Sequence, residues 1–157
     1  MRRTKMAVLG MMMVLSMTAC AGKAETKTIG VETTVQETTA EEDAGFKIQI
    51  PDEIRGVKAV AFRNLGTEML EVIYYDGDAE VARVRKGTGE DDISGDYNVY
   101  EIEEAADVTG TQVTLKGSAD GYALAVWNEG GYAYAVSVTK KITKDEILRI
   151  VEEIVKK

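Results

Sequence analysis

The clearest hydrophobic pattern in this chain is a pair of apolar runs between residues 121 and 138. The first run ends at Trp127 and the second begins at Tyr132, with Asn128-Glu129-Gly130-Gly131 between them. Two runs at this separation are typical of a β-hairpin. A three-residue loop at residues 128–130 would place the large side chains on one face and alanines on the other, so we predict that register. The bulky face would then consist of the pairs Val126–Tyr132, Leu124–Tyr134 and Tyr122–Val136.

The C-terminal residues show a second clear pattern, with apolar side chains at helical spacing. Ile147, Val151 and Ile154 recur along one face, which is typical of an amphipathic helix. Thr143 and Glu146 have the spacing of a capping box, in which the two residues satisfy each other's free amide groups. We therefore predict a helix at residues 143–155 whose apolar stripe packs on the bulky face of the hairpin.

Shorter alternations of apolar and polar residues predict further strands. They lie at residues 46–50, 57–62, 69–75, 79–85, 99–108 and 112–116. Residues 86–98 contain too much glycine and aspartate for a regular element. Together these elements predict an α+β fold, a curled antiparallel β-sheet with one C-terminal α-helix packed on it.

The N-terminal apolar segment is of a different kind. A positively charged start is followed by an uncharged apolar run that ends at Ala19-Cys20, as in a signal peptide. The run is shorter than the about 20 residues that a membrane span needs. It resembles the signal of bacterial lipoproteins, in which the cysteine is diacylated and becomes the mature N-terminus. Because Cys20 is the single cysteine, we predict its lipidation. The alternatives are an ordinary secretory signal and a buried free cysteine.

The composition changes again after the cysteine. Residues 21–44 lack aromatic side chains and are rich in threonine and glutamate, so they cannot bury enough apolar surface to fold alone. We predict that residues 1–19 are the signal peptide and that residues 20–44 form a lipidated, acidic and disordered tether. Residues 45–157 are then one small domain.

Removal of the signal peptide makes the chain strongly acidic. The signal contains three of the 19 basic residues and none of the 27 acidic ones, which leaves a formal charge of −11. This charge opposes nucleic-acid binding, which needs a basic surface. It also opposes electrostatic adhesion to anionic lipids, so attachment to the lipid bilayer would depend on the acyl chains of Cys20. The predicted location is the outer face of the cytoplasmic membrane.

Few residues in the chain are suited to catalysis. It contains no histidine, which removes the usual general base, the usual imidazole metal ligand and every histidine-dependent triad. No phosphate-binding loop, dinucleotide fingerprint or GxSxG motif occurs, and the cysteine is assigned to lipid. We predict no enzyme activity and no cofactor.

The acidic loop at residues 90–96 is the strongest candidate for a specific site. Counted from Asp92, oxygen-bearing side chains recur at alternate positions and Glu103 is twelfth, as in a calcium-binding loop. Tyr97, however, stands where that loop requires glycine, and no helix is predicted beside it. We predict no metal site, and a calcium site at Asp92, Asp96 and Glu103 is the alternative. In the favoured interpretation the aspartates cap turns in a solvated loop.

Two other groups of side chains have both a structural and a ligand-binding interpretation. Arg83, Arg85 and Lys86 either pair with the acids at residues 90–92 or bind an anion, and we favour ion pairing. The aromatic side chains of the hairpin either belong to the core, which we favour, or line a ligand groove. The candidate groove residues are Tyr122, Trp127, Tyr132 and Tyr134.

Several blocks of the sequence together resemble a known family. They are Arg85-Lys86 with Glu90 to Asn98, Val113 to Gly117, and Ala125 to Trp127 with Gly131 to Tyr134. The pattern resembles the domain-of-unknown-function family numbered 4367, found on membrane-anchored extracytoplasmic proteins of Gram-positive, clostridia-like bacteria. The resemblance spans most of residues 46–155 and implies a similar α+β domain on the outer face of the membrane. It implies no catalytic residues, because the family has no established activity.

These features predict a lipoprotein that binds an unknown envelope protein or a small ligand and catalyses no reaction. Acylated Cys20 would make the lipid bilayer its other partner. One alternative is a cell-envelope enzyme that uses paired carboxylates, and another is a purely structural envelope protein. The enzyme would need two acids held close together in a cleft, at least one of them with a raised pKa.

Overall fold

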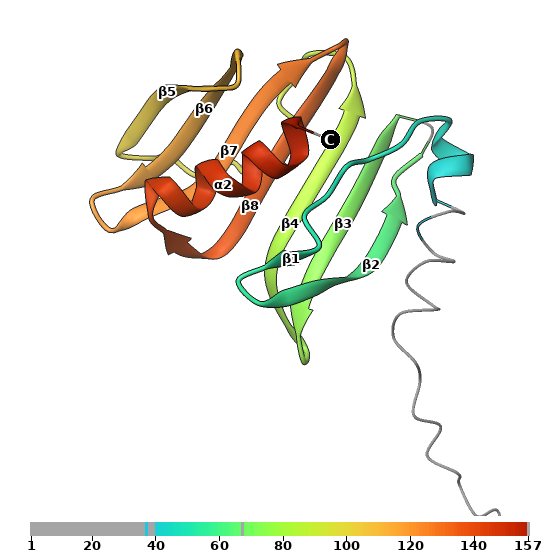
Figure 1. Ribbon diagram of the computed structural model, residues 1–157, viewed down its shortest axis with the longest axis horizontal. Coiled ribbons are helices and arrows are strands. Elements are labelled where there is room, and N and C mark those ends of the chain that lie inside the picture. The colour runs from blue at the N-terminus through green and yellow to red at the C-terminus, as the bar shows by residue number, and fades with distance from the viewer. Residues whose placement is uncertain (1–36, 38–39, 67, 157) are drawn as a thin grey trace, which may run out of the picture.

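The computed structural model describes residue 37, residues 40–66 and residues 68–156. Over these residues the chain forms a short helical turn at residues 40–44, one eight-stranded sheet and a C-terminal helix (Figure 1). The elements are β1 (Glu53–Ile54), β2 (Val57–Asn64), β3 (Met69–Asp76), β4 (Ala79–Thr88), β5 (Ile102–Val108), β6 (Thr111–Ser118), β7 (Gly121–Glu129), β8 (Tyr132–Ile142) and α2 (Lys144–Val155). The predicted α+β fold is confirmed. The predicted signal peptide, Cys20 and most of the predicted tether lie outside the described residues.

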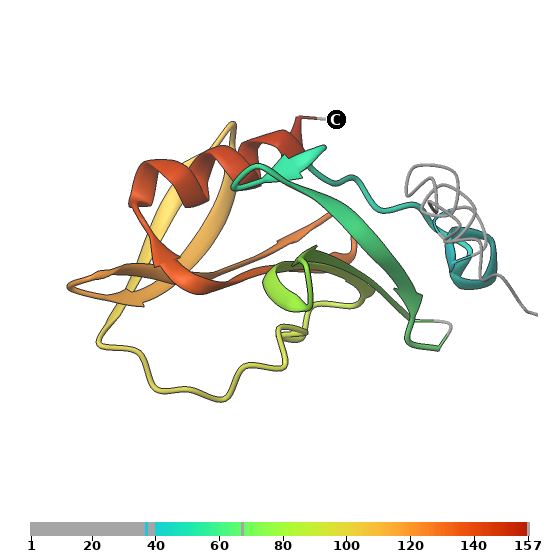
Figure 2. The ribbon, with the colours of Figure 1, turned by 90° about the horizontal axis from the view of Figure 1, so that it is seen from below.

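The sheet consists of two meanders that join in its middle. Its strand order is β1-β2-β3-β4-β8-β7-β6-β5. Strands β1 to β4 pair with their neighbours in sequence, as do β5 to β8, and the antiparallel pairing of β4 with β8 joins the halves. Figure 2 shows that the sheet curls, with α2 against one face and the segment of residues 89–101 below the other.

Helix α2 begins where the capping box predicts. Thr143 Oγ1 accepts a hydrogen bond from the Glu146 N–H at 3.3 Å, and Glu146 Oε2 accepts one from the Thr143 N–H at 2.9 Å. The buried stripe of the helix consists of Ile147, Ile150, Val151 and Ile154. It shares one core with Ala125, Trp127 and Val136 of the β7–β8 hairpin, so the helix covers the sheet through the predicted stripe.

The register of the β7–β8 hairpin differs from the prediction. Its loop is Gly130-Gly131, with φ angles of 61° and 83°, and Glu129 pairs with Tyr132. Consecutive positive φ angles are those of a type I′ turn, which matches the twist of the strands and which glycine adopts without strain. The predicted three-residue loop is therefore wrong. Large and small side chains mix on both faces, with Trp127 opposite Tyr134 and Val126 opposite Ala135.

The N-terminal part of the domain also differs from the prediction. Residues 46–50 form no strand, because a side chain takes the place of a neighbouring strand: the N–H of buried Ile48 donates to Glu41 Oε1 at 2.9 Å. Ala40, assigned to the tether from sequence, is 6% exposed in the core, and its carbonyl accepts from Asn64 Nδ2 at 3.4 Å. The packed part of the chain therefore includes residues 40–44. The strand predicted at residues 99–108 begins only at Ile102.

Candidate functional site

The two halves of the sheet are joined by a long irregular segment, residues 89–101, which we call the arch. It follows β4, crosses the face opposite α2 and leads into β5 (Figure 2). The acidic loop that the sequence singles out lies within it. The arch contains no helix or strand. The Gly89 N–H donates to the Gly131 carbonyl at 3.1 Å, and contacts made by side chains hold the rest in place.

Arg85 on β4 fastens the arch to the sheet. Its Nη1 donates hydrogen bonds to the carbonyl oxygens of Ile93 at 3.0 Å and Ser94 at 2.5 Å. Gly95 has a φ of 64°, and a Cβ on it would lie 2.5 Å from Arg85 Nη1. A larger residue at Gly95 would therefore be strained and would displace the guanidinium group.

Arg85 is itself held by a buried carboxylate, Glu71 on β3. Glu71 is 2% exposed, and its Oε2 accepts hydrogen bonds from Arg85 Nη2 at 2.7 Å and from Arg83 Nη1 at 2.8 Å. Arg63 Nη1 lies 3.6 Å from the other oxygen, and Arg83 also makes a bidentate pair with Glu80. Burial of a carboxylate is tolerated only when it is paired and hydrogen-bonded. This network therefore fixes Arg85, and Arg85 fixes the arch.

Two aspartates shape the turns of the arch. Asp92 Oδ1 accepts from the Ser94 N–H and Asp96 Oδ1 accepts from the Asn98 N–H, each at 2.8 Å. Burial alone would raise the pKa of both carboxyls, but the hydrogen bonds that they accept outweigh it and lower both pKa values. The Tyr100 hydroxyl donates to Asp96, and burial together with this bond raises the pKa of Tyr100 to about 12.

The fastened arch presents two large apolar side chains to water. Tyr97 is 96% exposed and Val99 is 99% exposed, whereas the other exposed large apolar side chain of the described residues, Leu65, is 43% exposed. Tyr97 also borders a shallow groove of about 470 Å³ that Arg83 and Arg85 line. Two such side chains close together on an ordered polar loop make this part of the arch a candidate contact surface.

The three acids of the alternative calcium site, Asp92, Asp96 and Glu103, interact with hydrogen-bond donors and a lysine of the protein itself. Asp92 and Asp96 accept from backbone amides of the arch, and Asp92 also lies 3.5 Å from Lys116 Nζ. Glu103 lies 3.9 Å from the same lysine. Over the described residues, no group of three or more acidic, histidine or cysteine side chains is placed to hold a metal ion.

The ion-pairing interpretation of the basic patch holds for two of its residues, but the partners differ from those predicted. Arg83 and Arg85 pair with Glu71 and Glu80 instead of the acids at residues 90–92. Alternation along β4 places these arginines on the arch side of the sheet. Lys86 therefore points to the other face.

Lys86 lies over two of the four candidate groove residues, Tyr132 and Tyr134, and a third, Trp127, stacks beside them. Trp127 is 4% exposed and stacks on Tyr134 with ring centroids 5.1 Å apart. Lys86 Nζ lies 4.3 Å from the ring centroid of Tyr132 and 5.4 Å from that of Tyr134. Phe46 contacts Tyr132 at 5.2 Å from the N-terminal side. Burial lowers the pKa of Lys86. This aromatic cluster is filled by the protein's own lysine and packs on the core.

Tyr122, the fourth candidate groove residue, lies apart from this cluster at the start of β7. Its hydroxyl donates to Glu104, which also pairs with Lys144 of α2 at 2.8 Å. The hydrogen bonds from Lys144 and Tyr122 lower the pKa of Glu104. The four aromatic side chains therefore do not line one common groove.

The sequence interpretation missed two features of the site, although each has a signal. Glu71 is the single acid between Met69 and Tyr75, and an isolated charge inside an apolar strand indicates a buried ion pair. Tyr97 and Val99 are apolar residues close together in a loop rich in glycine, aspartate and asparagine. In the calcium-loop pattern, Tyr97 stands out only because glycine is required at its position. In the structure, its ring is one of the two apolar side chains that the arch exposes.

Comparisons with known proteins gave no match for this domain. No protein-family model matches the chain, and searches of curated proteins and of solved structures found no significant match. The resemblance to family 4367 therefore stays a prediction. Within the described residues, no helix has both the length and the apolar character needed to cross a membrane.

Proposed function

We propose that this chain is a lipoprotein on the outer face of the cytoplasmic membrane whose domain binds another envelope protein through the arch. In this proposal the acyl chains of Cys20 hold the chain on the bilayer, and the segment after Cys20 acts as a spacer. The domain has no enzyme activity and uses no cofactor. The lipoprotein-like signal and the resemblance to an extracytoplasmic family support the location.

The observation that carries the binding role is the exposure of Tyr97 and Val99 on a fastened loop. Burial of apolar surface in a complex is favourable by about 25 cal/mol per Å², and tyrosine is enriched among the residues that dominate binding energy. The bonds of Arg85 to the arch hold this loop before a partner arrives. Less conformational entropy is then lost on binding.

A protein partner fits this surface better than a small ligand does. Small molecules bind in concave sites that enclose most of their surface. The side chains of Tyr97 and Val99 are instead almost fully exposed, and project from the arch into solvent. Such projecting side chains suit a pocket on a second protein.

Site-specific photocrosslinking in cells that carry the chain tests this proposal. A benzophenone amino acid at Tyr97 should give a light-dependent adduct with a defined envelope protein, and Val99→Ser should weaken that adduct. The matched control carries the same probe at Leu65, which is also exposed. Absence of an adduct from residue 97, or the same adducts from both positions, would contradict the proposal. Turnover of cell-wall material by purified protein carrying Tyr97→Ser would favour the carboxylate enzyme instead.

A further inference from the structure

The free edge of β5 is a second surface of the domain, separate from the arch. Among the described strands, β5 ends the strand order and pairs only with β6. Figure 1 shows no described segment beyond it. Alternate residues of an edge strand direct their backbone N–H and C=O groups away from the sheet, where another strand can pair with them.

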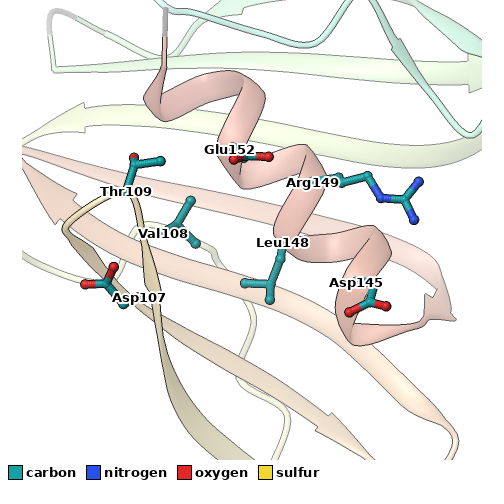
Figure 3. A pocket seen from close by; sticks show the side chains of 7 residues that line it. All are labelled: Asp107, Val108, Thr109, Asp145, Leu148, Arg149 and Glu152. Atoms are coloured by element: carbon teal, nitrogen blue, oxygen red, sulfur yellow. The ribbon is translucent and has the colours of Figure 1, made fainter.

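A groove runs beside this edge, between β5 and α2 (Figure 3). Its volume is about 360 Å³, and Val108 and Leu148 form its apolar floor. The charged residues around this floor are Asp107, Asp145, Glu152 and Arg149, which together carry a formal charge of −2. Glu152 also pairs with Lys156 at the C-cap of the same helix. The helix side of the groove therefore remains acidic mainly through Asp145 and the second oxygen of Glu152.

The edge strand itself is acidic as well. β5 contains Glu103, Glu104 and Asp107 and no basic residue. A second copy paired on this edge would bring two strands of equal negative charge together, and like charges on paired strands destabilise the pairing. The charge therefore disfavours self-association and favours a basic partner strand.

We propose that β5 accepts an extended segment rich in lysine or arginine, supplied by a partner protein, as an additional strand. The backbone of that segment would pair with the free edge of β5. Its side chains alternate between the two sides of the sheet, so basic residues at alternate positions would lie on the helix side and reach Asp145 and Glu152. This surface involves no residue of the arch and goes beyond the function proposed above.

A synthetic ten-residue peptide that alternates lysine and valine is a suitable probe. We expect saturable binding to the mature chain carrying Cys20→Ala, measured by fluorescence anisotropy at physiological ionic strength. The same peptide with an N-methyl group on every residue keeps its charge but has no backbone N–H at either edge, so it cannot pair as a strand. It should bind at least about tenfold more weakly, since each lost hydrogen bond is worth about 0.5–1.5 kcal/mol. A peptide with glutamate in place of lysine should not bind.

Matched variants locate the site on the domain. The double variant Asp145→Asn with Glu152→Gln should weaken binding of the lysine–valine peptide by about tenfold. Asp76→Asn with Asp78→Asn removes the same charge at the exposed β3–β4 turn and should leave the affinity unchanged, as should Tyr97→Ser. If the N-methylated peptide binds as tightly as its parent, or if both double variants weaken binding equally, the attraction is unspecific and the proposal is wrong. Thermal melting confirms that each variant is folded.

Discussion

At the scale of single residues, Glu71 links the sheet to the arch. Its carboxylate holds Arg83 and Arg85, and Arg85 in turn holds the carbonyl of Ser94. Removal of the carboxylate would leave partly buried guanidinium groups without their counter-charge. Breaking a buried ion pair in this way costs about 3–5 kcal/mol, whereas exposed pairs contribute about 0–1 kcal/mol.

We therefore expect Glu71→Ala to lower the free energy of unfolding by about 3–5 kcal/mol, measured by urea denaturation. Glu80→Ala removes a more exposed partner of Arg83 and should cost about 0–1 kcal/mol. The Glu71 variant should also be cleaved faster within the arch by a protease. Equal losses in the two variants would show that Glu71 is not the residue that fixes the network.

At the scale of elements, helix α2 shows how a local signal sets a boundary. Both hydrogen bonds of its capping box are present, and the chain leaves the extended conformation at Thr143. Loss of such a cap typically costs about 1 kcal/mol. The hydrogen bonds from the backbone and hydroxyl of Thr143 lower the pKa of Glu146 below its ordinary value of 4.5, which makes the contribution of this carboxylate depend on pH.

Thr143→Ala should lower the free energy of unfolding by about 1 kcal/mol at pH 7. Because the pKa of Glu146 is lower in the folded state, its carboxylate stabilises the fold above pH 4.5. That stabilisation is lost as the pH falls through the folded-state pKa. Wild type should consequently exceed Glu146→Gln in stability at neutral pH and approach it in acid, as chemical denaturation across pH would measure. A pH-independent difference would contradict the assigned bonds.

Local and distant determinants explain which elements the sequence predicted. The helix start at Thr143 depends on residues within one turn, so it was predictable. The β7–β8 register depends on where the loop lies. The segregation of large side chains favoured a loop at residues 128–130, whereas the adjacent Gly130 and Gly131 indicated the two-residue loop that the structure has. Irregular structure was predicted from composition at residues 86–98. This holds for residues 89–98 of the arch, whereas residues 86–88 belong to β4 and the strand predicted at residues 99–101 is absent. The residues that fasten the arch, Arg85 and Glu71, lie on neighbouring strands and become its partners only when β3 pairs with β4.

At the scale of the whole molecule, the free edge of β5 lies far from the N-terminal side of the domain. Ala40 contacts Asn64 at the end of β2, whereas β5 is at the opposite end of the strand order (Figure 1). A chain anchored by its N-terminus could therefore turn the β5 edge away from the membrane. This arrangement suits a domain that meets a partner away from its own point of attachment.

The predicted anchor is tested by Cys20→Ala. This change removes the thiol that would carry the acyl chains, so the protein should move from the membrane fraction to the soluble fraction of disrupted cells. Met17→Leu keeps the cysteine and brings the signal closer to the common lipoprotein pattern, so this control should remain with the membrane. If the alanine variant sediments like wild type, another segment attaches the chain.

The strand order also sets the sequence of events during synthesis. The first meander, through β4, emerges from the ribosome before β8 exists, yet residues 82–88 of β4 pair with residues 132–138 of β8. Until the second meander is complete, β4 pairs with β3 on one side and has a free edge on the other. Free strand edges promote aggregation. Glu71 and Glu80, the ion-pair partners of Arg83 on β4, also belong to this first meander. Charged side chains on β4 oppose the pairing of its free edge with another nascent chain.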